Sequence, residues 1–272
     1  MTEMRPGLTF ATHDGAELKG DLYLPSGDGP HPVVIAVPGG AWLRGDKKQL
    51  GHWGRHLAEA GFAVFAIDYR RATAGKVFPH NVQDVMAAAR FVQAEAGQLS
   101  LDAEHIGLLG ASAGAHLSAL AALAQGEPWL DGAPVAFKTL VAVYGVYDLV
   151  AHWQADLDKN AAAGQDPTVR MLGATPYDDQ RLYFDASPIR HVSYAGNALK
   201  TLLIWGADDA DVSPAQSESF ARALRQARFF VRTLPVPGAG HFWFSDEPID
   251  TPHSATGKVA PGLVAFLKQH LA

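Results

Sequence analysis

Short runs of consecutive apolar residues recur along this 272-residue chain and alternate with segments whose apolar positions follow helical spacing. Continuous apolar runs are typical of strands that are covered on both faces of a sheet. They predict buried strands at Val33–Val37, Phe62–Tyr69, Ile106–Leu109, Leu140–Tyr144, Thr201–Trp205 and Phe229–Leu234. The intervening segments predict helices near Gln49–Gly61, Asn81–Ala96, Ala113–Leu123, Pro214–Ala227 and Val259–Leu271. Because strands alternate with helices, the chain is expected to form a mostly parallel sheet flanked by helices.

Three segments depart from this alternation. Leu8–Leu24 alternates loosely between apolar and polar residues around Asp14-Gly15, which predicts an antiparallel hairpin at a sheet edge. Leu99–Glu104 carries no strand pattern and is expected to be a loop. Residues 149–195 lack strand runs and carry scattered aromatic residues and prolines, so they predict a helical insertion outside the sheet. The expected architecture is one domain over residues 1–272, with an eight-stranded sheet and a short, cap-like helical insertion at 149–195.

A serine lies at the sharp turn between the third predicted strand and the helix that follows it. The turn reads Gly110-Ala111-Ser112-Ala113-Gly114, so only small residues surround the hydroxyl. In a G-x-S-x-G turn between a strand and a helix, the serine hydroxyl is exposed above the strand ends. The first amides of the helix are free and point toward it. We therefore interpret Ser112 as a nucleophile; the alternative is an ordinary strand–turn–helix connection with an incidental serine.

A serine hydroxyl needs a general base to become a nucleophile, and the base needs a third group that orients it. The carboxyl ends of parallel strands meet at one edge of a sheet, so residues that follow different strands can meet there. His241 follows one predicted strand within a glycine-rich loop, and an acidic loop follows another. The candidate acids are Asp208, Asp209 and Asp211 in the acidic loop, with Asp148 after a third strand as a second choice. The order serine, aspartate, histidine is the order found in α/β-hydrolases.

Composition narrows the classes of function. Apolar residues make up 48% of the chain, which is sufficient for a large folded core. The formal net charge is −6 and no basic run stands out, so nucleic acid and anionic membranes are not expected partners. The chain has no cysteine, which excludes disulfides and cysteine nucleophiles, and no pattern indicates a metal or another cofactor. The opening residues lack the apolar core of a secretion signal, so a cytoplasmic protein is expected, as a monomer or homodimer.

Together, these motifs resemble those of α/β-hydrolase esterases with an HGGGW-like oxyanion loop. This group holds bacterial carboxylesterases, feruloyl-esterase-like proteins and kynurenine formamidases. The resemblance covers nearly the whole chain and rests on Pro38-Gly39-Gly40-Ala41-Trp42, Asp68-Tyr69-Arg70, Gly110-Ala111-Ser112-Ala113-Gly114, Gly206-x-x-Asp209-x-x-Val212 and Gly240-His241. It implies the α/β-hydrolase fold, with Ser112 as nucleophile, His241 as base and Asp209 as acid.

The resemblance also implies an oxyanion hole that is formed by backbone amides. Its donors are expected from Ala113 and from the loop after Val37, where we favour Gly40 and Ala41. Ala41 is expected to donate its N–H if its φ is negative. The first histidine of the family motif is replaced here by Pro38, which has no N–H and removes a side chain that could brace the loop.

The expected activity is hydrolysis of carboxylic esters of small to medium neutral substrates through an acyl-enzyme. Trp42, Phe242 and Trp243 are candidate substrate-binding residues because they lie in the loops of the expected site; the alternative is that most of the aromatic residues pack the cap onto the sheet. His116, on the helix that follows Ser112, is interpreted as a packing residue and not as the base. Two other functions stay open: an arylformamidase or peptidase-like amide hydrolase, and a non-catalytic binding protein on the same fold.

Overall fold

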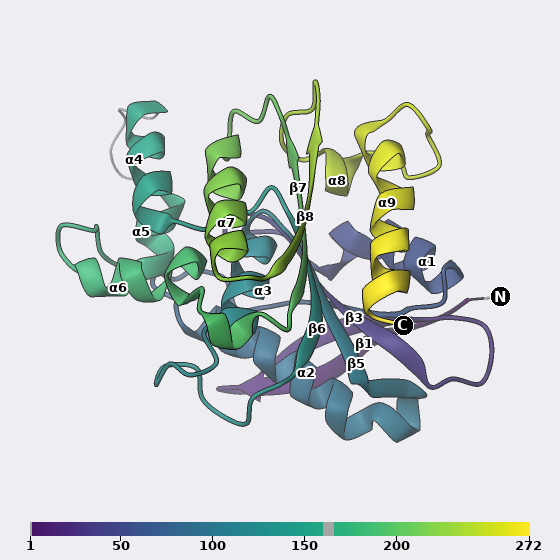
Figure 1. The fold of residues 1–272 in the computed structure, drawn as a ribbon. Helices are drawn as coiled ribbons and strands as arrows, with labels where there is room; N and C mark the ends of the chain where they lie inside the picture. The colour runs from purple at the N-terminus through teal and green to yellow at the C-terminus, as the bar shows by residue number, and fades with distance from the viewer. Residues whose placement is uncertain (1, 160–165) are drawn as a thin grey trace.

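The computed structural model describes residues 2–159 and 166–272, and these residues form one eight-stranded sheet (Figure 1). The strands are β1 Glu3–His13, β2 Ala16–Leu24, β3 His31–Val37, β4 Ala63–Ile67, β5 Leu101–Ala111, β6 Phe137–Val143, β7 Lys200–Gly206 and β8 Phe230–Val236. They lie side by side in the order β1-β2-β4-β3-β5-β6-β7-β8. β2 pairs antiparallel with both β1 and β4, whereas all the other neighbours are parallel. The predicted mostly parallel sheet, with a hairpin at one edge, is therefore confirmed.

Helices cover both faces of the sheet (Figure 1). They are the 3-10 helix η1 Lys47–Leu50, α1 Gly51–Glu59, α2 His80–Leu99, α3 Ala113–Leu123, α4 Leu149–Lys159, α5 Pro167–Leu172, α6 Gln180–Asp185, the 3-10 helices η2 Pro188–His191 and η3 Tyr194–Gly196, α7 Pro214–Gln226, α8 Trp243–Asp246 and α9 Ala255–His270. In Figure 1, α1 and α9 lie on one side of the sheet, and α2, α3 and α7 lie on the other. The central strands β4, β6 and β7 are almost completely buried between these layers, and no residue of β4 is exposed. The expectation of a buried strand at Phe229–Leu234 is corrected: β8 lies at the sheet edge, and its residues before Val236 are exposed or partly buried. Between β6 and β7, the described residues form helices and turns without a strand.

One strand also begins earlier than the sequence-based expectation. β5 begins at Leu101, although the sequence pattern indicates a loop at Leu99–Glu104. The first residues of β5 pair with the start of β3, and a register shift then separates them from the apolar run that begins at Ile106. Residues 102–105, which span this shift, are partly buried or exposed and three of the four are polar, so a hydrophobicity pattern does not reveal them as part of a strand.

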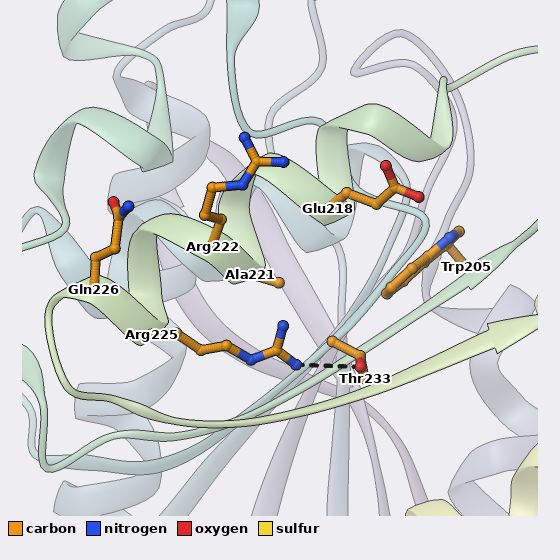
Figure 2. A pocket seen from close by; sticks show the side chains of 7 residues that line it. All are labelled: Trp205, Glu218, Ala221, Arg222, Arg225, Gln226 and Thr233. Atoms are coloured by element: carbon orange, nitrogen blue, oxygen red, sulfur yellow. Dashed lines mark hydrogen bonds between the residues drawn. The ribbon is translucent and has the colours of Figure 1, made fainter.

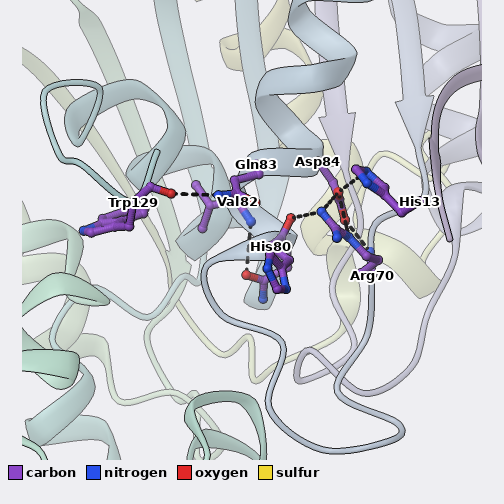
Figure 3. Close-up of polar contacts among 8 residues, drawn as sticks. His13, Arg70, His80, Val82, Gln83, Asp84 and Trp129 are labelled. Atoms are coloured by element: carbon purple, nitrogen blue, oxygen red, sulfur yellow. Dashed lines mark hydrogen bonds and ion pairs between the residues drawn. The ribbon is translucent and has the colours of Figure 1, made fainter. Parts of the chain in front are cut away.

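A buried ion pair fixes the loop after β4 to α2 and to the end of β1 (Figure 3). The carboxylate of Asp84 is fully buried and accepts hydrogen bonds from Arg70, at 2.6 Å from Nη2, 3.0 Å from Nε and 2.7 Å from the backbone amide. The Nε2 atom of His13 lies 3.3 Å from the same carboxylate. Arg70 also donates to the carbonyl of His80, at 3.1 Å. Removing the carboxylate would therefore leave a guanidinium that has lost its main partner.

We expect Asp84→Ala to lower the free energy of unfolding by about 3 kcal/mol, the lower end of the usual range for breaking a buried ion pair. The lower end applies because the Arg70 side chain is 26% exposed and can be partly hydrated. Urea unfolding followed by circular dichroism measures the change. Glu3→Ala is the control, since it breaks an exposed pair with Arg5 and should leave the midpoint nearly unchanged. Equal losses in the two variants would contradict the structural role of Asp84.

Candidate active site

Ser112 lies on the turn between β5 and α3, in a backbone conformation that few residues other than glycine adopt. Its φ is 53° and its ψ is −119°, the strained geometry of a serine held out at a strand-to-helix turn. The turn can form because glycines flank it. A Cβ at Gly110 would meet the backbone of Gly114, and a Cβ at Gly114 would meet the carbonyl of Val37 at the end of β3. The serine is therefore held close to the ends of both β3 and β5.

A chain of hydrogen bonds joins Ser112, His241 and Asp209. The Oγ of Ser112 lies 3.0 Å from Nε2 of His241, and Nδ1 of His241 lies 2.7 Å from Oδ2 of Asp209. Since an ionised carboxylate only accepts, Nδ1 carries the ring proton, and Nε2 is left to accept the proton of the serine hydroxyl. The second carboxylate oxygen accepts hydrogen bonds from the amides of Asp211 and Val212. These bonds fix the buried aspartate, which in turn holds the histidine in the tautomer that a base requires.

The loops after β7 and β8 are paired with each other, which brings the aspartate beside the histidine. The amide of Ala207 donates to the carbonyl of Val236 at 2.9 Å, and the amide of Asp208 donates to the carbonyl of Ala239 at 3.0 Å. A Cβ at Gly206 would meet the backbone of the second loop, so this close approach needs a glycine. Of the three aspartates in the loop after β7, Asp209 is buried, whereas Asp208 and Asp211 are exposed.

Asp148, the other candidate acid, has a different environment. Its Oδ1 accepts hydrogen bonds from the amides of Val150 and Ala151, both at 3.1 Å, in the first turn of α4. Its Oδ2 lies 3.4 Å from the guanidinium of Arg190. Asp148 therefore caps α4, and the structure places Asp209, not Asp148, against His241.

Tyr144, the residue that follows β6, packs against the histidine and belongs to no catalytic motif. The ring centroids of Tyr144 and His241 are 4.3 Å apart, and Trp243 packs edge-on against the tyrosine at 5.7 Å. Tyr144 has a φ of 39°, and its amide donates to the carbonyl of Ile204 at 2.7 Å. Burial raises the pKa of its hydroxyl, so the tyrosine is an uncharged side chain packed beside the imidazole. Its position directly after a buried strand is the one sequence signal that indicates it.

The three aromatic residues expected to bind substrate lie in different environments. Phe242 has a φ of 65°, is 52% exposed and contacts the ring of His241 edge-on at 4.6 Å. Trp42 and Trp243 are only 2% and 4% exposed, so the expectation that they line the substrate cleft is corrected. Both rings are instead used in packing, Trp243 against Tyr144 and Trp42 against a histidine of α3. Phe242 is the one of the three whose side chain can contact a bound molecule.

Helix α1 supports the segment that follows His241. The carbonyl of Phe244 accepts a hydrogen bond from Nε1 of Trp53 at 2.9 Å and lies 3.0 Å from Nε2 of His52. The rings of Trp53 and Phe244 stack with centroids 4.3 Å apart. Burial lowers the pKa of His52, so this contact is made by a neutral ring near pH 7. The short helix α8 is therefore anchored to the core directly behind the histidine loop.

The loop Pro38–Trp42 follows β3 and lies against Ser112. A Cβ at Gly39 would lie 3.3 Å from the Cβ of Ser112. The φ angles are 120° at Gly40 and 52° at Ala41, so the negative φ set as the condition for donation by Ala41 is not found. The physical reason is a tight turn, in which the carbonyl of Gly40 accepts hydrogen bonds from the amides three and four residues later. Ala41 stays a candidate donor because no acceptor is placed for its amide among the described residues.

Backbone amides beside the serine are available to bind an oxygen. Among residues 2–159 and 166–272, no hydrogen-bond acceptor is placed for the amides of Gly40 and Ala41. Ala113 is the first residue of α3, and the first amides of a helix have no partner within it. The hydroxyl of Tyr69 donates to the carbonyl of Pro38 at 3.2 Å. This bond braces the start of the loop, at the position where the HGGGW-like motif has a histidine and this chain has Pro38.

A separate groove of about 540 Å³ lies between α7 and β8 (Figure 2). Its lining residues are Trp205, Glu218, Ala221, Arg222, Arg225, Gln226 and Thr233. Ser112, His241 and Asp209 do not belong to this set.

In the part of the chain that the structure describes, no group of three or more histidines and carboxylates is placed to hold a metal ion. None of the described helices has the length and apolar character needed to cross a membrane.

The sheet, the serine turn and the histidine and aspartate at neighbouring strand ends define an α/β-hydrolase. The BD-FAE family model matches residues 20–224, and the chain belongs to this family. The chain is 33% identical over 248 residues to Esterase LipC of Mycobacterium tuberculosis, covering 88% of this chain and 59% of that protein. It is 27% identical over 254 residues to a probable isoprenylcysteine alpha-carbonyl methylesterase, ICMEL2, of Arabidopsis thaliana, covering 88% and 57%. The chain spans about half the length of the curated relatives it matches.

Solved structures give the same fold. A bifunctional GH43-CE protein of Bacteroides eggerthii matches with a TM-score of 0.80 and 27% identity, covering 98% of this chain and 38% of that one. Carboxyl esterase 2 of the mycorrhizal fungus Tuber melanosporum matches with a TM-score of 0.79 and 24% identity, covering 100% of this chain and 89% of that one. The resemblance to esterases of the α/β-hydrolase superfamily, given above from the motifs, is therefore confirmed.

We expect Gly114→Ala to lower the free energy of unfolding by about 1–3 kcal/mol, the usual cost of overpacking a close contact. The added Cβ would meet the carbonyl of Val37 and force α3 away from β3. Gly126→Ala is the matched control, because a Cβ there meets no atom within 4 Å. Thermal unfolding of the two variants measures the difference. A Gly114→Ala protein as stable as the control would show that the turn can relax without cost.

Proposed function

We propose that this chain is a serine esterase that cleaves carboxylic esters of small to medium neutral substrates through Ser112, His241 and Asp209. The observation that carries the proposal is the hydrogen-bonded chain, with 3.0 Å between Oγ and Nε2 and 2.7 Å between Nδ1 and Oδ2. The names of the relatives support an ester as the bond that is cleaved, since they include an esterase, a probable carboxylic ester hydrolase and probable methylesterases.

In the proposed mechanism, Nε2 of His241 takes the proton of Ser112 while Oγ attacks the ester carbonyl carbon. The imidazolium that forms is stabilised by the buried carboxylate of Asp209. His241 then gives the proton to the departing alcohol oxygen, and the carbon–oxygen bond to the alcohol breaks, which leaves an acyl-enzyme. Water, activated by the same nitrogen, attacks the acyl carbon and releases the acid and the free serine.

The negative charge of the tetrahedral intermediate needs donors that are already in place. We assign this role to the amides of Ala113, which follows Ser112, and of Gly40 and Ala41, which follow Gly39 in the loop that lies against Ser112. These amides have the free N–H groups described above. Losing one such donor typically lowers the rate by roughly a hundred- to a thousandfold. No charged side chain is required to bind the proposed substrate, because its carbonyl is neutral in the ground state.

We further propose that the described parts of the insertion, residues 149–159 and 166–195, cap this site and that Phe242 contacts the substrate; residues 160–165 of the expected insertion lie outside the described residues. Phe242 is the exposed aromatic residue beside the base. In the described part of the insertion, Tyr183 is buried, whereas Tyr177 and Phe184 are exposed. Exposed aromatic side chains leave apolar surface open to a ligand. They favour neutral, partly aromatic substrates over charged ones.

We expect an activated short-chain aryl ester to give a burst of about one equivalent of alcohol per chain, which Ser112→Ala abolishes. The burst reports the acyl-enzyme, because alcohol leaves before the acyl group is hydrolysed. Ser118→Ala is the matched control, since Ser118 is a second serine of α3 and is fully buried. Stopped-flow absorbance of the released alcohol measures both.

Two outcomes would contradict the proposal. Turnover that persists in Ser112→Ala at the wild-type rate would exclude Ser112 as nucleophile and favour a binding protein with incidental activity. A kcat/KM for N-formyl aryl amides far above that for aryl esters would favour the arylformamidase alternative, with the same nucleophile acting on a different bond.

We expect Asp209→Asn to lower kcat by about 10⁴-fold, because it reverses the histidine tautomer. One carboxylate oxygen accepts from two backbone amides, so the asparagine oxygen would take that place and its NH₂ group would face Nδ1 of His241. Nδ1 would then accept, and Nε2 would carry the proton and lose its role as base. Asp208→Asn is the control, since Asp208 is exposed in the same loop. Steady-state kinetics with the same aryl ester compares the two variants, and similar rates would contradict the assignment.

A further inference from the structure

One buried histidine joins the oxyanion loop to α3 and to the helical insertion. His116 lies in α3, about one turn after the serine, and is fully buried. Its Nδ1 lies 3.0 Å from Nε1 of Trp42, and its Nε2 lies 2.8 Å from the carbonyl oxygen of Ala186 at the end of α6. The rings of Trp42 and His116 also meet edge-on at 5.3 Å. Three segments that are far apart in the sequence therefore meet at a single imidazole.

The tryptophan that this histidine contacts belongs to a strained turn. Ala41 and Trp42 have φ angles of 52° and 59°, although neither residue is a glycine. Such angles are disfavoured for ordinary residues and persist where the surroundings hold them in place. The carbonyl of Trp42 accepts a hydrogen bond from the amide of Ala72 at 2.9 Å, which is one anchor. The bond from the buried indole to His116 is the second.

Both ring nitrogens of His116 are used by one neutral tautomer. An indole N–H can only donate, so Nδ1 must accept from Trp42, and the ring proton is carried by Nε2, which donates to Ala186. Burial, with a smaller contribution from His152 of α4, whose ring also packs on Trp42, lowers the pKa of His116 to about 4. The ring is therefore neutral near pH 7. With both nitrogens occupied, it has none left to act as a base for Ser112.

We infer that His116 is a positioning residue of the proposed esterase: it fixes the indole of Trp42, and through it the Gly40 and Ala41 amides that bind the oxyanion. The inference rests on the proposed function. The amides precede Trp42 directly in the chain, so a rotation of Trp42 toward a relaxed φ would displace them. A residue needed for packing alone would be served by an apolar side chain, because a buried imidazole requires that both its nitrogens be satisfied.

A second buried histidine provides a matched control. The Nε2 of His191 lies 2.8 Å from the carbonyl oxygen of Asp185, the residue before Ala186, so both histidines bond to the end of α6. The rest of the His191 ring faces Glu127 and Trp129 instead of the oxyanion loop. His191→Gln therefore removes a buried ring and its contacts with Glu127 and Trp129 beside the same end of the insertion, without touching Trp42.

Two conservative substitutions separate the two hydrogen bonds of His116. Asparagine can place its oxygen near the position of Nδ1, so His116→Asn keeps an acceptor for Trp42 and loses the bond to Ala186. Glutamine can place its amide nitrogen near the position of Nε2, so His116→Gln keeps the donor to Ala186 and leaves the indole N–H without a partner. Trp42→Phe removes the same indole N–H while His116 stays intact.

We expect His116→Gln and Trp42→Phe each to lower kcat for the aryl ester by about 10- to 100-fold, less than the full loss of an oxyanion donor. KM should change little, because the displaced amides act mainly in the transition state. His116→Asn should recover most of kcat, and the double variant Trp42→Phe/His116→Gln should be no slower than either single variant. His191→Gln should keep wild-type kcat. Thermal unfolding of each variant confirms that it is folded at the assay temperature.

The possible failures are distinguishable. If Ser112→Ala keeps wild-type turnover, the proposed function is wrong, and the inference falls with it. If Ser112→Ala is inactive while folded Trp42→Phe and His116→Gln keep wild-type kcat, the inference alone is overturned. It is also overturned if His116→Asn loses as much kcat as His116→Gln, or if His191→Gln loses as much as either, since the effect would then follow the insertion and not the bond to Trp42.

Discussion

The close contact between the serine turn and β3 is the constraint on which the site depends. Gly110 and Gly114 have no Cβ, so α3 can begin directly above β3 and β5, and Ser112 can hold a φ of 53°. β3 continues from Val37 into the oxyanion loop, so the same contact sets the distance between the serine and that loop. The adjacency of β3 and β5 in the sheet therefore places the serine and this loop together, as the proposed chemistry requires, and also builds the core.

The other half of the site is fixed by backbone pairing between two loops. The loops after β7 and β8 hydrogen-bond to each other through main-chain groups, so the relative position of Asp209 and His241 does not depend on flexible side chains. Tyr144 then packs on the imidazole, and Trp53 of α1 holds the carbonyl of Phe244 behind it. Ser112, Asp209 and His241 thus follow β5, β7 and β8 at one edge of the sheet. Under the proposed function, groups held in this way are already in place and need no rearrangement during reaction.

The sequence predicts the parts of this structure that depend on local pattern. Buried strands appear as continuous apolar runs, and the order of serine, aspartate and histidine at strand ends indicates which residues meet. The start of β5 and the burial of Trp42 are not predicted, because each depends on a distant partner. The indole of Trp42 donates a hydrogen bond to His116, 74 positions later, and β5 is extended by pairing with β3. The positive φ of Ala41 is not predicted because it comes from a tight turn that the sequence pattern does not mark. Tyr144 is missed because no motif marks a residue that packs on a base.

The replacement of the family's histidine by Pro38 is explained by how the oxyanion loop is held. Proline fixes its own φ and offers only a carbonyl, and the hydroxyl of Tyr69 binds that carbonyl. At the other end of the loop, the indole of Trp42 is bound by His116 and its carbonyl by Ala72. The amides of Gly40 and Ala41 therefore lie in a segment that is anchored at both ends by buried groups. The groups that hold this loop in place therefore belong to the loop that follows β4 and to α3, and a brace within the motif itself is not needed.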